Sequence, residues 1–510
     1  MFLCFLLYGP VAASDKPINY LDPPQGRFID DWMIVELSGA KAGYAHSTMS
    51  REGDEIATSL LTIFKLGRAE RAVSVRMEQS TRETVAGVPL SFETVMQLGR
   101  TAMKTRGRIQ AGEVQVISSQ FGFDTRQTAK LPEGALMAWG VFRASIEHGF
   151  EPGTTYDLYL YEPSMRVDGP VKARTVVGER VKIDHLGVKR DAFRVVSTIE
   201  IGAGEVDSVA FVDDQGQVLQ AETSLGGFVL KFIRVDRATA LKEFDAPEFL
   251  VNTLVEIDQA IDRAAAKRIV YELRVSGAQQ EIPKLPDTSM QSTRDHSGKS
   301  VIVDVRRLDH DALSKAVVRS EDIRAATVRE RSGRAEMEEF LAATPALNSK
   351  DELLVRMSQE AAGDAASPYA VADKLRVYVS DVIVDKNLNI GFATASEVCR
   401  KREGDCTEHA VLLAALGRAR GIPSRVVVGL AYVPAFVGKK NVFGFHMWTQ
   451  FHIGGRWIDF DAALGETDCS PARIALATSS LKDTAVGEMA LPILDLMTGL
   501  NIEIKSIETR

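Results

Sequence analysis

The stretch GDCTEHAVLLAALGRARGIPSR at residues 404–425, followed by HMWTQFHIGGRWIDFD at 446–461, decides the fold of the C-terminal part of this chain. Asp405 is a good helix N-cap, and Glu408 stands three residues later, as in a capping box. An apolar run follows, and a Gly-Ile-Pro sequence ends it. The first segment therefore predicts a buried helix that begins at Cys406, where unpaired backbone N–H groups and the helix dipole stabilise a thiolate.

The second segment predicts a hairpin, because the Gly-Gly pair at 454–455 is a two-residue loop that suits the twist of paired strands. Pairing across this loop places Trp448 opposite Asp461. Since side chains alternate, His446 and Asp461 then share one face as diagonal neighbours, about 7 to 8 Å apart at the backbone. The imidazole can accept the proton of Cys406 while the carboxylate orients the ring, which is the arrangement that thiol chemistry requires.

Several other interpretations of these residues remain open. His452 and Asp459 are also diagonal neighbours on the same face, so spacing alone allows a second histidine–aspartate pair. We expect His409 on the surface of the helix. Cys399 and Cys406 could form a redox disulfide, although their spacing is not Cys-x-x-Cys. No pair of residues has the spacing of a structural zinc site, and we expect neither a metal nor a cofactor.

Length and composition restrict the class of protein. The chain has 510 residues, which predicts two to four domains. With 45% hydrophobic and 25% charged residues it has the profile of a soluble globular protein, and its net charge of -8 with no basic block argues against a nucleic-acid partner. Nothing after the N-terminus approaches the ~18 apolar residues of a membrane-spanning helix. Residues 1–14 have a short apolar core and small residues where a signal peptidase would cut, but no basic n-region. We expect a signal peptide and an exported protein, with a frayed apolar end as the alternative.

Residues 15–245 are predicted to form a β-rich N-terminal domain. Runs with β-branched, aromatic and alternating character, such as 32–37 and 156–161, are separated by turn signals and indicate an antiparallel meander. A helix at about 132–149 interrupts the strands and is expected to pack on the sheet. Such a sheet could hold an apolar ligand, but covering a core is the better explanation of the helix.

Residues 246–345 are predicted to form a mixed connecting module, and 346–510 the domain that carries the site. Within the connecting module we expect a helix at 254–267 and a strand at 269–275, followed by a Pro-rich polar loop. Two helices precede the site, and one of them begins at Pro368, which suits a first helical turn.

These motifs in this order resemble the transglutaminase-like superfamily over about residues 346–475. The resemblance implies an α+β fold, in which the β-rich antiparallel N-terminal region is followed by a papain-like, transglutaminase-like domain. It implies that Cys406 is the nucleophile, His446 the general base and then acid, and Asp461 the orienting carboxylate. Trp448 and Trp457 are candidates for the walls of a substrate groove, with packing under the hairpin as the alternative.

The resemblance also implies a reaction. Members of the superfamily form a thioester with a glutamine side chain or cleave an amide, and then pass the acyl group to an amine or to water. We therefore expect a thiol-dependent amide hydrolase or acyltransferase that acts on peptides or proteins, with hydrolysis preferred over crosslinking. The alternative is a catalytically silent protein that uses its β-rich domain for binding or assembly.

The sequence departs from the family in two places. Met447 replaces the alanine that often follows the histidine, and Ala462 and Ala463 replace Pro-Thr after the aspartate, so substrate selection stays open. A side chain that would complete an oxyanion hole is not evident, and the candidates are Tyr369, Asn387 and Asn389.

Overall fold

The computed structural model divides the chain into two compact units, residues 1–67 with 72–248, and residues 68–71 with 249–510. The domain boundaries expected from the sequence stay predictions, as does the signal peptide at 1–14, which lies outside the described residues. The structure describes residues 18–68, 71–98, 101–120, 123–163, 169–201, 204–225, 228–276, 281–309, 337–386, 392–482 and 496–509.

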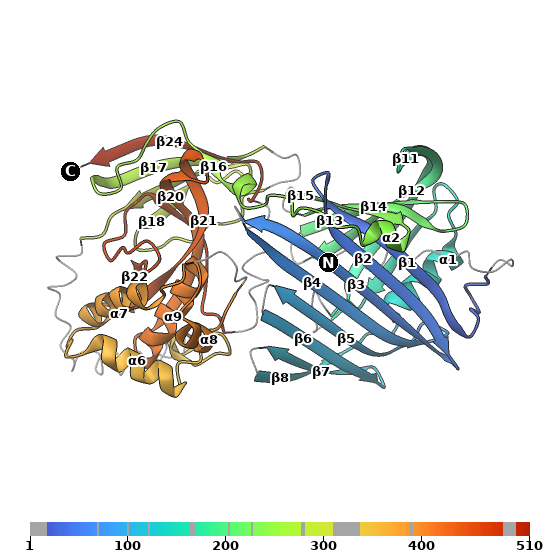
Figure 1. The fold of residues 1–510 in the computed structure, drawn as a ribbon, viewed down its shortest axis with the longest axis horizontal. Coiled ribbons are helices and arrows are strands. Elements are labelled where there is room, and N and C mark those ends of the chain that lie inside the picture. Colours follow the sequence, from blue (N-terminus) through green and yellow to red (C-terminus); the bar gives the residue numbers. More distant parts are fainter. Residues whose placement is uncertain are drawn as a thin grey trace. The chain divides into compact units, whose positions relative to one another are not determined.

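The first unit is built on one 15-stranded sheet (Figure 1). Its strands follow the chain order, and β1 pairs with β15 in the middle of the sheet, so two meanders join there. All pairs with a recorded register are antiparallel except the short parallel pair β9–β10. The predicted antiparallel region is confirmed. The strands are β1 Gly26–Leu37, β2 Ala40–Glu52, β3 Glu55–Arg68, β4 Arg71–Thr84, β5 Pro89–Leu98, β6 Thr101–Gln110, β7 Glu113–Gln120, β8 Phe123–Lys130, β9 Ala135–Leu136, β10 Thr155–Leu160, β11 Val171–His185, β12 Val188–Ile201, β13 Gly204–Val212, β14 Val218–Leu225 and β15 Phe228–Val235.

One long helix, α1 (Ala138–His148), packs against this sheet through Trp139 and Phe142, both of which are buried. Its N-terminus has no cap of its own. Instead the buried carboxylate of Glu83 on β4 accepts the backbone N–H groups of Trp139 at 2.7 Å and Gly140 at 2.9 Å. Burial raises the pKa of Glu83 to about 7, although these hydrogen bonds oppose the increase. A short helix, α2 (Arg237–Ala240), follows β15.

The described part of the second unit combines two sheets with four helices (Figure 1). A five-stranded sheet has the order β16-β21-β20-β23, with β22 paired to β21, and a four-stranded sheet has the order β18-β19-β17-β24. The strands and the 3-10 turn η1 are η1 Val251–Thr253, β16 Val255–Glu256, β17 Ala266–Val275, β18 Gln291–Arg294, β19 Ser300–Arg306, β20 Ser424–Phe436, β21 Lys439–Ile453, β22 Arg456–Phe460, β23 Arg473–Ser479 and β24 Leu500–Thr509. The helices are α6 Glu352–Ala362, α7 Pro368–Val382, α8 Ala395–Lys401 and α9 Cys406–Ala419.

A single core joins the two sheets of this unit. Tyr271 of β17 packs edge-on against Phe443 of β21, and Ile474 of β23 and Ile502 of β24 lie in the same buried cluster. The helices occupy the other side of the five-stranded sheet, with α9 against β20 and β21 (Figure 1). The helix that carries the site therefore has a firmly packed base.

The helix predicted at 254–267 is wrong. Val255 and Glu256 form β16 by pairing with Phe443 and Val442 of β21. The carboxylate of Asp262 then accepts the backbone N–H groups of Ala264 and Ala265, which makes a local turn instead of a helix. Tertiary pairing and side-chain turn chemistry outweigh the apolar periodicity of this stretch. No helix in the described part of the chain is long and apolar enough to cross a membrane.

Candidate active site

Cys406 is the first residue of α9, as the sequence predicted. The carboxylate of Asp405 accepts the backbone N–H of Thr407 at 2.9 Å, and the carboxylate of Glu408 accepts the N–H of Asp405 at 2.9 Å, so the capping box is complete. Gly404 has φ +148°, and a Cβ there would lie 2.3 Å from the Cβ of Glu408. The Gly-Asp-Cys sequence therefore satisfies a steric requirement in addition to a chemical one. Cys406 itself is half-buried.

Glu408 fastens the start of α9 to the segment before α8. Its other carboxylate oxygen accepts the backbone N–H of Ala393 at 3.0 Å. The side chain is fully buried, and burial together with the nearby charge of Asp405 raises its pKa to about 8.

The hairpin has the predicted register, with Gln450 opposite Asp459 and Ile453 opposite Arg456 across the Gly-Gly loop. This register brings the imidazole of His446 to the carboxylate of Asp461, with Nε2 at 2.8 Å from Oδ2. Asp461 is fully buried and the His446 side chain is 10% exposed. The pair therefore interacts in a setting where water screens it little.

His446 also contacts the thiol. Burial opposes a charged imidazole, but the charges of Asp461 and Cys406 and hydrogen bonds to both side chains outweigh it and raise the pKa of His446 to about 10. For Asp461, burial favours the neutral acid, yet the charge and hydrogen bond of His446 and the charge of Arg473 keep its pKa below the usual range. The structure thus brings the three side chains together as a thiol, an imidazole and a carboxylate.

Comparison with known protein families adds the decisive match. Residues 355–462 match the family model of the transglutaminase-like superfamily. The C-terminal part of this chain is a transglutaminase-like domain. The match ends one residue after Asp461 and includes Cys406 and His446.

Solved structures give only distant likenesses. They are a candidate cysteine protease from Cytophaga hutchinsonii, with 16% identity, 48% of this chain and 90% of that chain covered and a TM-score of 0.30; a β-barrel-like protein from Brucella abortus, with 14% identity, coverage of 42% and 96% and a TM-score of 0.33; and a candidate protease from Parabacteroides distasonis, with 9% identity, coverage of 75% and 68% and a TM-score of 0.20. These likenesses are too weak to carry an argument. No curated protein matches the chain.

The rival pair of His452 and Asp459 is not formed in the transglutaminase-like domain. Asp459 accepts hydrogen bonds from the indole Nε1 of Trp448 and from Gln450 Nε2, the latter at 3.1 and 3.2 Å. His452 packs edge-on against Trp457 instead. Burial lowers the pKa of His452, as does the charge of a neighbouring arginine. Asp459 therefore binds the indole of Trp448 and does not pair with His452.

The two tryptophans have different surroundings. Trp448 is 2% exposed and its ring stacks on that of His446 at 6.1 Å, which favours packing over a groove wall. Trp457 is half-buried, with the guanidinium of Arg425 4.3 Å from its ring centre and Phe340 packed edge-on. A substrate contact for Trp457 stays a prediction.

The surface position predicted for His409 is wrong. The side chain is 2% exposed, and its Nδ1 lies 2.6 Å from the backbone oxygen of Asp405. Burial lowers its pKa. The error has a simple cause, because nearly every residue of α9 after the first turn is buried and the helix has no surface face.

The remaining candidates are also placed. Cys399 is a free buried thiol whose pKa burial raises to about 11, and Cys406 is free as well, so the redox disulfide is not formed. Tyr369 lies against Phe460, while Asn387 and Asn389 lie outside the described residues. Among the residues that the structure describes, no group of three His, Cys, Asp or Glu side chains could hold a metal ion.

Sequence reasoning missed one residue at this site. Arg473 is buried at the start of β23, and its Nη1 lies 3.3 Å from Oδ2 of Asp461. It comes after the family match, and no motif or spacing in the sequence indicates it.

Proposed function

We propose that this protein is a thiol-dependent amide hydrolase or acyltransferase that acts on peptides or proteins through Cys406, His446 and Asp461. One observation carries the proposal: a thiol at a helix N-terminus contacts an imidazole that is itself held at 2.8 Å by a buried carboxylate. The transglutaminase-like family match supports the same class of chemistry. Export of the chain, expected from residues 1–14, belongs to the same proposal.

The reaction divides into two steps. The thiolate of Cys406 attacks the carbonyl carbon of the amide, and protonated His446 gives its proton to the departing amine as the C–N bond breaks, which leaves a thioester. Neutral His446 then takes a proton from water or from an acceptor amine as that nucleophile attacks, and the thiolate leaves. Asp461 fixes the orientation of the imidazole and balances its charge in both steps. Water is the preferred acceptor in this proposal.

The alternative, a catalytically silent binding protein, has less support. A thiol without a catalytic task has no need of an imidazole and a fully buried carboxylate in line with it, because burying a charged pair costs stability unless geometry compensates.

The proposal is tested first by the reactivity of the thiol. Iodoacetamide is added near neutral pH and the labelled peptide is identified by mass spectrometry in the wild type, Cys406→Ser and His446→Ala. We expect fast labelling of Cys406 that falls at least about tenfold in His446→Ala. His452→Ala is the matched control, since this histidine lies on the same strand but contacts Trp457. Equal labelling rates in the wild type and His446→Ala would overturn the proposal.

The second experiment separates the two acceptors. The protein is incubated with a glutamine-containing peptide and a labelled primary amine. Release of ammonia or a cleaved peptide without incorporation of the amine supports hydrolysis, and incorporation supports transfer. If neither product forms although Cys406 of the wild-type protein is reactive, the result argues against peptide amides as the substrate class.

A further inference from the structure

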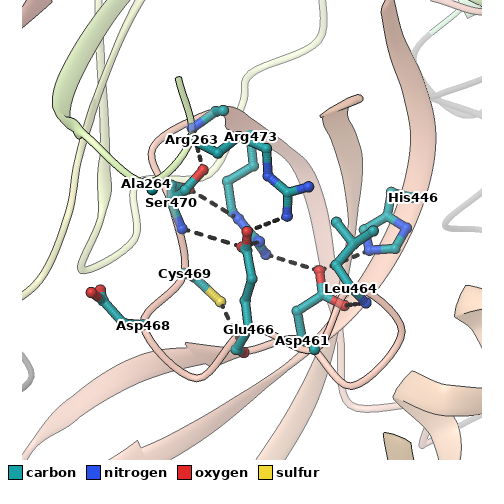
Figure 2. Close-up of polar contacts among 12 residues, drawn as sticks. Arg263, Ala264, His446, Asp461, Leu464, Glu466, Asp468, Cys469, Ser470 and Arg473 are labelled. Atoms are coloured by element: carbon teal, nitrogen blue, oxygen red, sulfur yellow. Dashed lines mark hydrogen bonds and ion pairs between the residues drawn. The ribbon is translucent and has the colours of Figure 1, made fainter. Parts of the chain in front are cut away.

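Arg473 is a buried cation that contacts the proposed catalytic carboxylate directly. Its side chain is 4% exposed. Figure 2 shows its guanidinium between two carboxylates: Nη1 lies 3.3 Å from Oδ2 of Asp461, and Nη2 bonds to Oε2 of Glu466. Its Nε also donates to the backbone oxygen of Ser470 at 3.2 Å. Each nitrogen of the guanidinium thus has an acceptor, which is the condition for keeping such a charge inside a protein.

Glu466 ties this guanidinium to the loop that carries Asp461. The backbones of Asp461 and Glu466 exchange two hydrogen bonds, each of 2.8 Å, which close the loop between them. The carboxylate of Glu466 also accepts from the backbone N–H of Ser470 at 3.3 Å and from Arg263 (Figure 2). Arg263 precedes β17 and lies well before the family match that begins at residue 355. A side chain outside the family core therefore holds the outer end of the cluster.

The same guanidinium also supports the histidine. It lies over the ring of Trp448, with 5.1 Å between its carbon and the ring centre, and Trp448 in turn stacks on His446. Arg473 thus contacts one support of His446 and the carboxylate partner of His446 at once. A guanidinium suits both contacts because it is planar and carries a fixed fork of donors.

Asp461 must stay ionised during the proposed reaction, and the contact with Arg473 favours its ionised form. In the proposed reaction His446 is charged before it protonates the departing amine and neutral afterwards. A fully buried carboxylate beside a neutral imidazole would tend to take up a proton, because burial favours the neutral acid. Arg473 stays charged throughout and shares the oxygen that His446 uses.

We propose that Arg473 is a positioning residue, which keeps Asp461 ionised and aimed at His446 through both half-reactions while Glu466 and Arg263 hold the guanidinium in place. This inference rests on the proposed function. It also makes Arg263 part of the active site, although this residue lies outside the family match at 355–462.

The charges around Asp461 agree with this role. It is faced by His446 from β21, by Arg473 from β23, by His409 from α9 and by the buried thiol of Cys469. Burial opposes the charge on Arg473, but its neighbours Cys469, Asp461 and Glu466 outweigh burial and raise the pKa of the guanidinium. Among these groups Arg473 is the one that remains a cation at every pH where proteins are stable.

The test compares Arg473→Gln and Arg473→Lys with a matched control, Arg418→Gln. Arg418 is 5% exposed and bonds the backbone oxygens of Ala342, Ser424 and Ser480 in the same unit, without contact to Asp461. The rate of Cys406 alkylation by iodoacetamide is measured from pH 4 to 9, and folding is checked by circular dichroism. We expect the acid side of the profile to move up by about one pH unit in Arg473→Gln. In Arg473→Lys the acid side of the profile should stay at the wild-type pH, but alkylation of Cys406 should be several-fold slower.

The control variant Arg418→Gln should behave differently from Arg473→Gln. Loss of Arg418 should lower thermal stability and leave the pH profile where it is in the wild type. A profile for Arg473→Gln that coincides with the wild type would overturn the proposal. If Arg473→Gln does not fold, the lysine variant decides, since wild-type reactivity in Arg473→Lys would show that the fork to Asp461 and Glu466 has no role.

A second readout is independent of the thiol. The ¹³C signal of the Asp461 carboxyl group, identified by its absence in Asp461→Asn, is followed against pH in a Cys406→Ala background. We expect it to titrate at a higher pH in Arg473→Gln than in the parent, and identical titrations would refute the role of Arg473. Should alkylation prove insensitive to His446, the proposed function fails by itself, and this titration still decides the inference about Arg473.

Discussion

Asp461 and Asp459 lie two residues apart and are both buried, but they hold different partners, so replacing each by asparagine separates orientation of the histidine from packing. The pKa of His446 rises from 6.5 to about 10, which corresponds to about 5 kcal/mol at about 1.36 kcal/mol per pH unit. The charge of Asp461 is the largest of the effects that raise it. An opposite charge in direct contact shifts a pKa by about 1 to 3 units, so we take about 2 units, or about 2 to 3 kcal/mol, for Asp461. This corresponds to a change on the order of 10²-fold in the ratio of charged to neutral His446.

We therefore expect Asp461→Asn to lower the rate of amide turnover by at least about 10²-fold. The loss would reach about 10⁴-fold if the asparagine also selects the wrong imidazole tautomer. The rate of Cys406 alkylation should fall in parallel. Asp459→Asn keeps an oxygen for the indole N–H of Trp448 and should reduce either rate by less than about tenfold.

Both rates are measured on variants that unfold cooperatively, with thermal unfolding as the check on folding. The pH dependence of stability gives a further sign. Because the folded pKa of His446 is raised, its stabilising effect is complete below pH 6.5 and is lost as the pH rises through about 10, and Asp461→Asn should remove about half of that dependence. Equal loss of turnover in well-folded Asp459→Asn and Asp461→Asn would refute the assignment of the pair.

Three further predictions concern the supports of the site and of the first unit. Gly404→Ala should lower both thermal stability and alkylation of the helix thiol, because the new Cβ would meet Glu408 at 2.3 Å; a wild-type melting temperature would contradict this. Trp448→Phe keeps the aromatic ring but leaves Asp459 short of a donor, and urea titration should show a loss of about 1 to 3 kcal/mol. Glu83 has a raised pKa, so its contribution to stability is complete below pH 4.5 and is lost as the pH rises through about 7. The free energy of unfolding in urea should therefore be lower at pH 8 than at pH 5, and Glu83→Gln should abolish this difference. The same difference in the variant would exclude this carboxyl group as its source.

The sequence alone determined much of the local structure around Cys406. A capping residue, a glutamate three positions later and an apolar run fix a helix start by nearest-neighbour chemistry, and the Gly-Gly loop fixes the hairpin register by backbone conformation. Both are short-range effects, so they are readable in a single sequence. The pairing of His446 with Asp461 follows from that register.

Strand alternation could not decide between the two histidine–aspartate pairs, since both satisfy it. The family resemblance pointed to His446 and Asp461, and the tertiary structure gives the physical reason. Asp459 is taken by Trp448 and Gln450, and that choice depends on which side chains are buried around it. The strand at 255–256 likewise exists because β21 offers it a partner more than 180 residues later in the chain. Arg473 reaches Asp461 through sheet packing and a closed loop, so its contact leaves no periodicity or motif in the sequence. Local hydrogen-bonding chemistry is encoded in neighbouring residues, whereas the partners of a buried charge are fixed only when distant segments pack together.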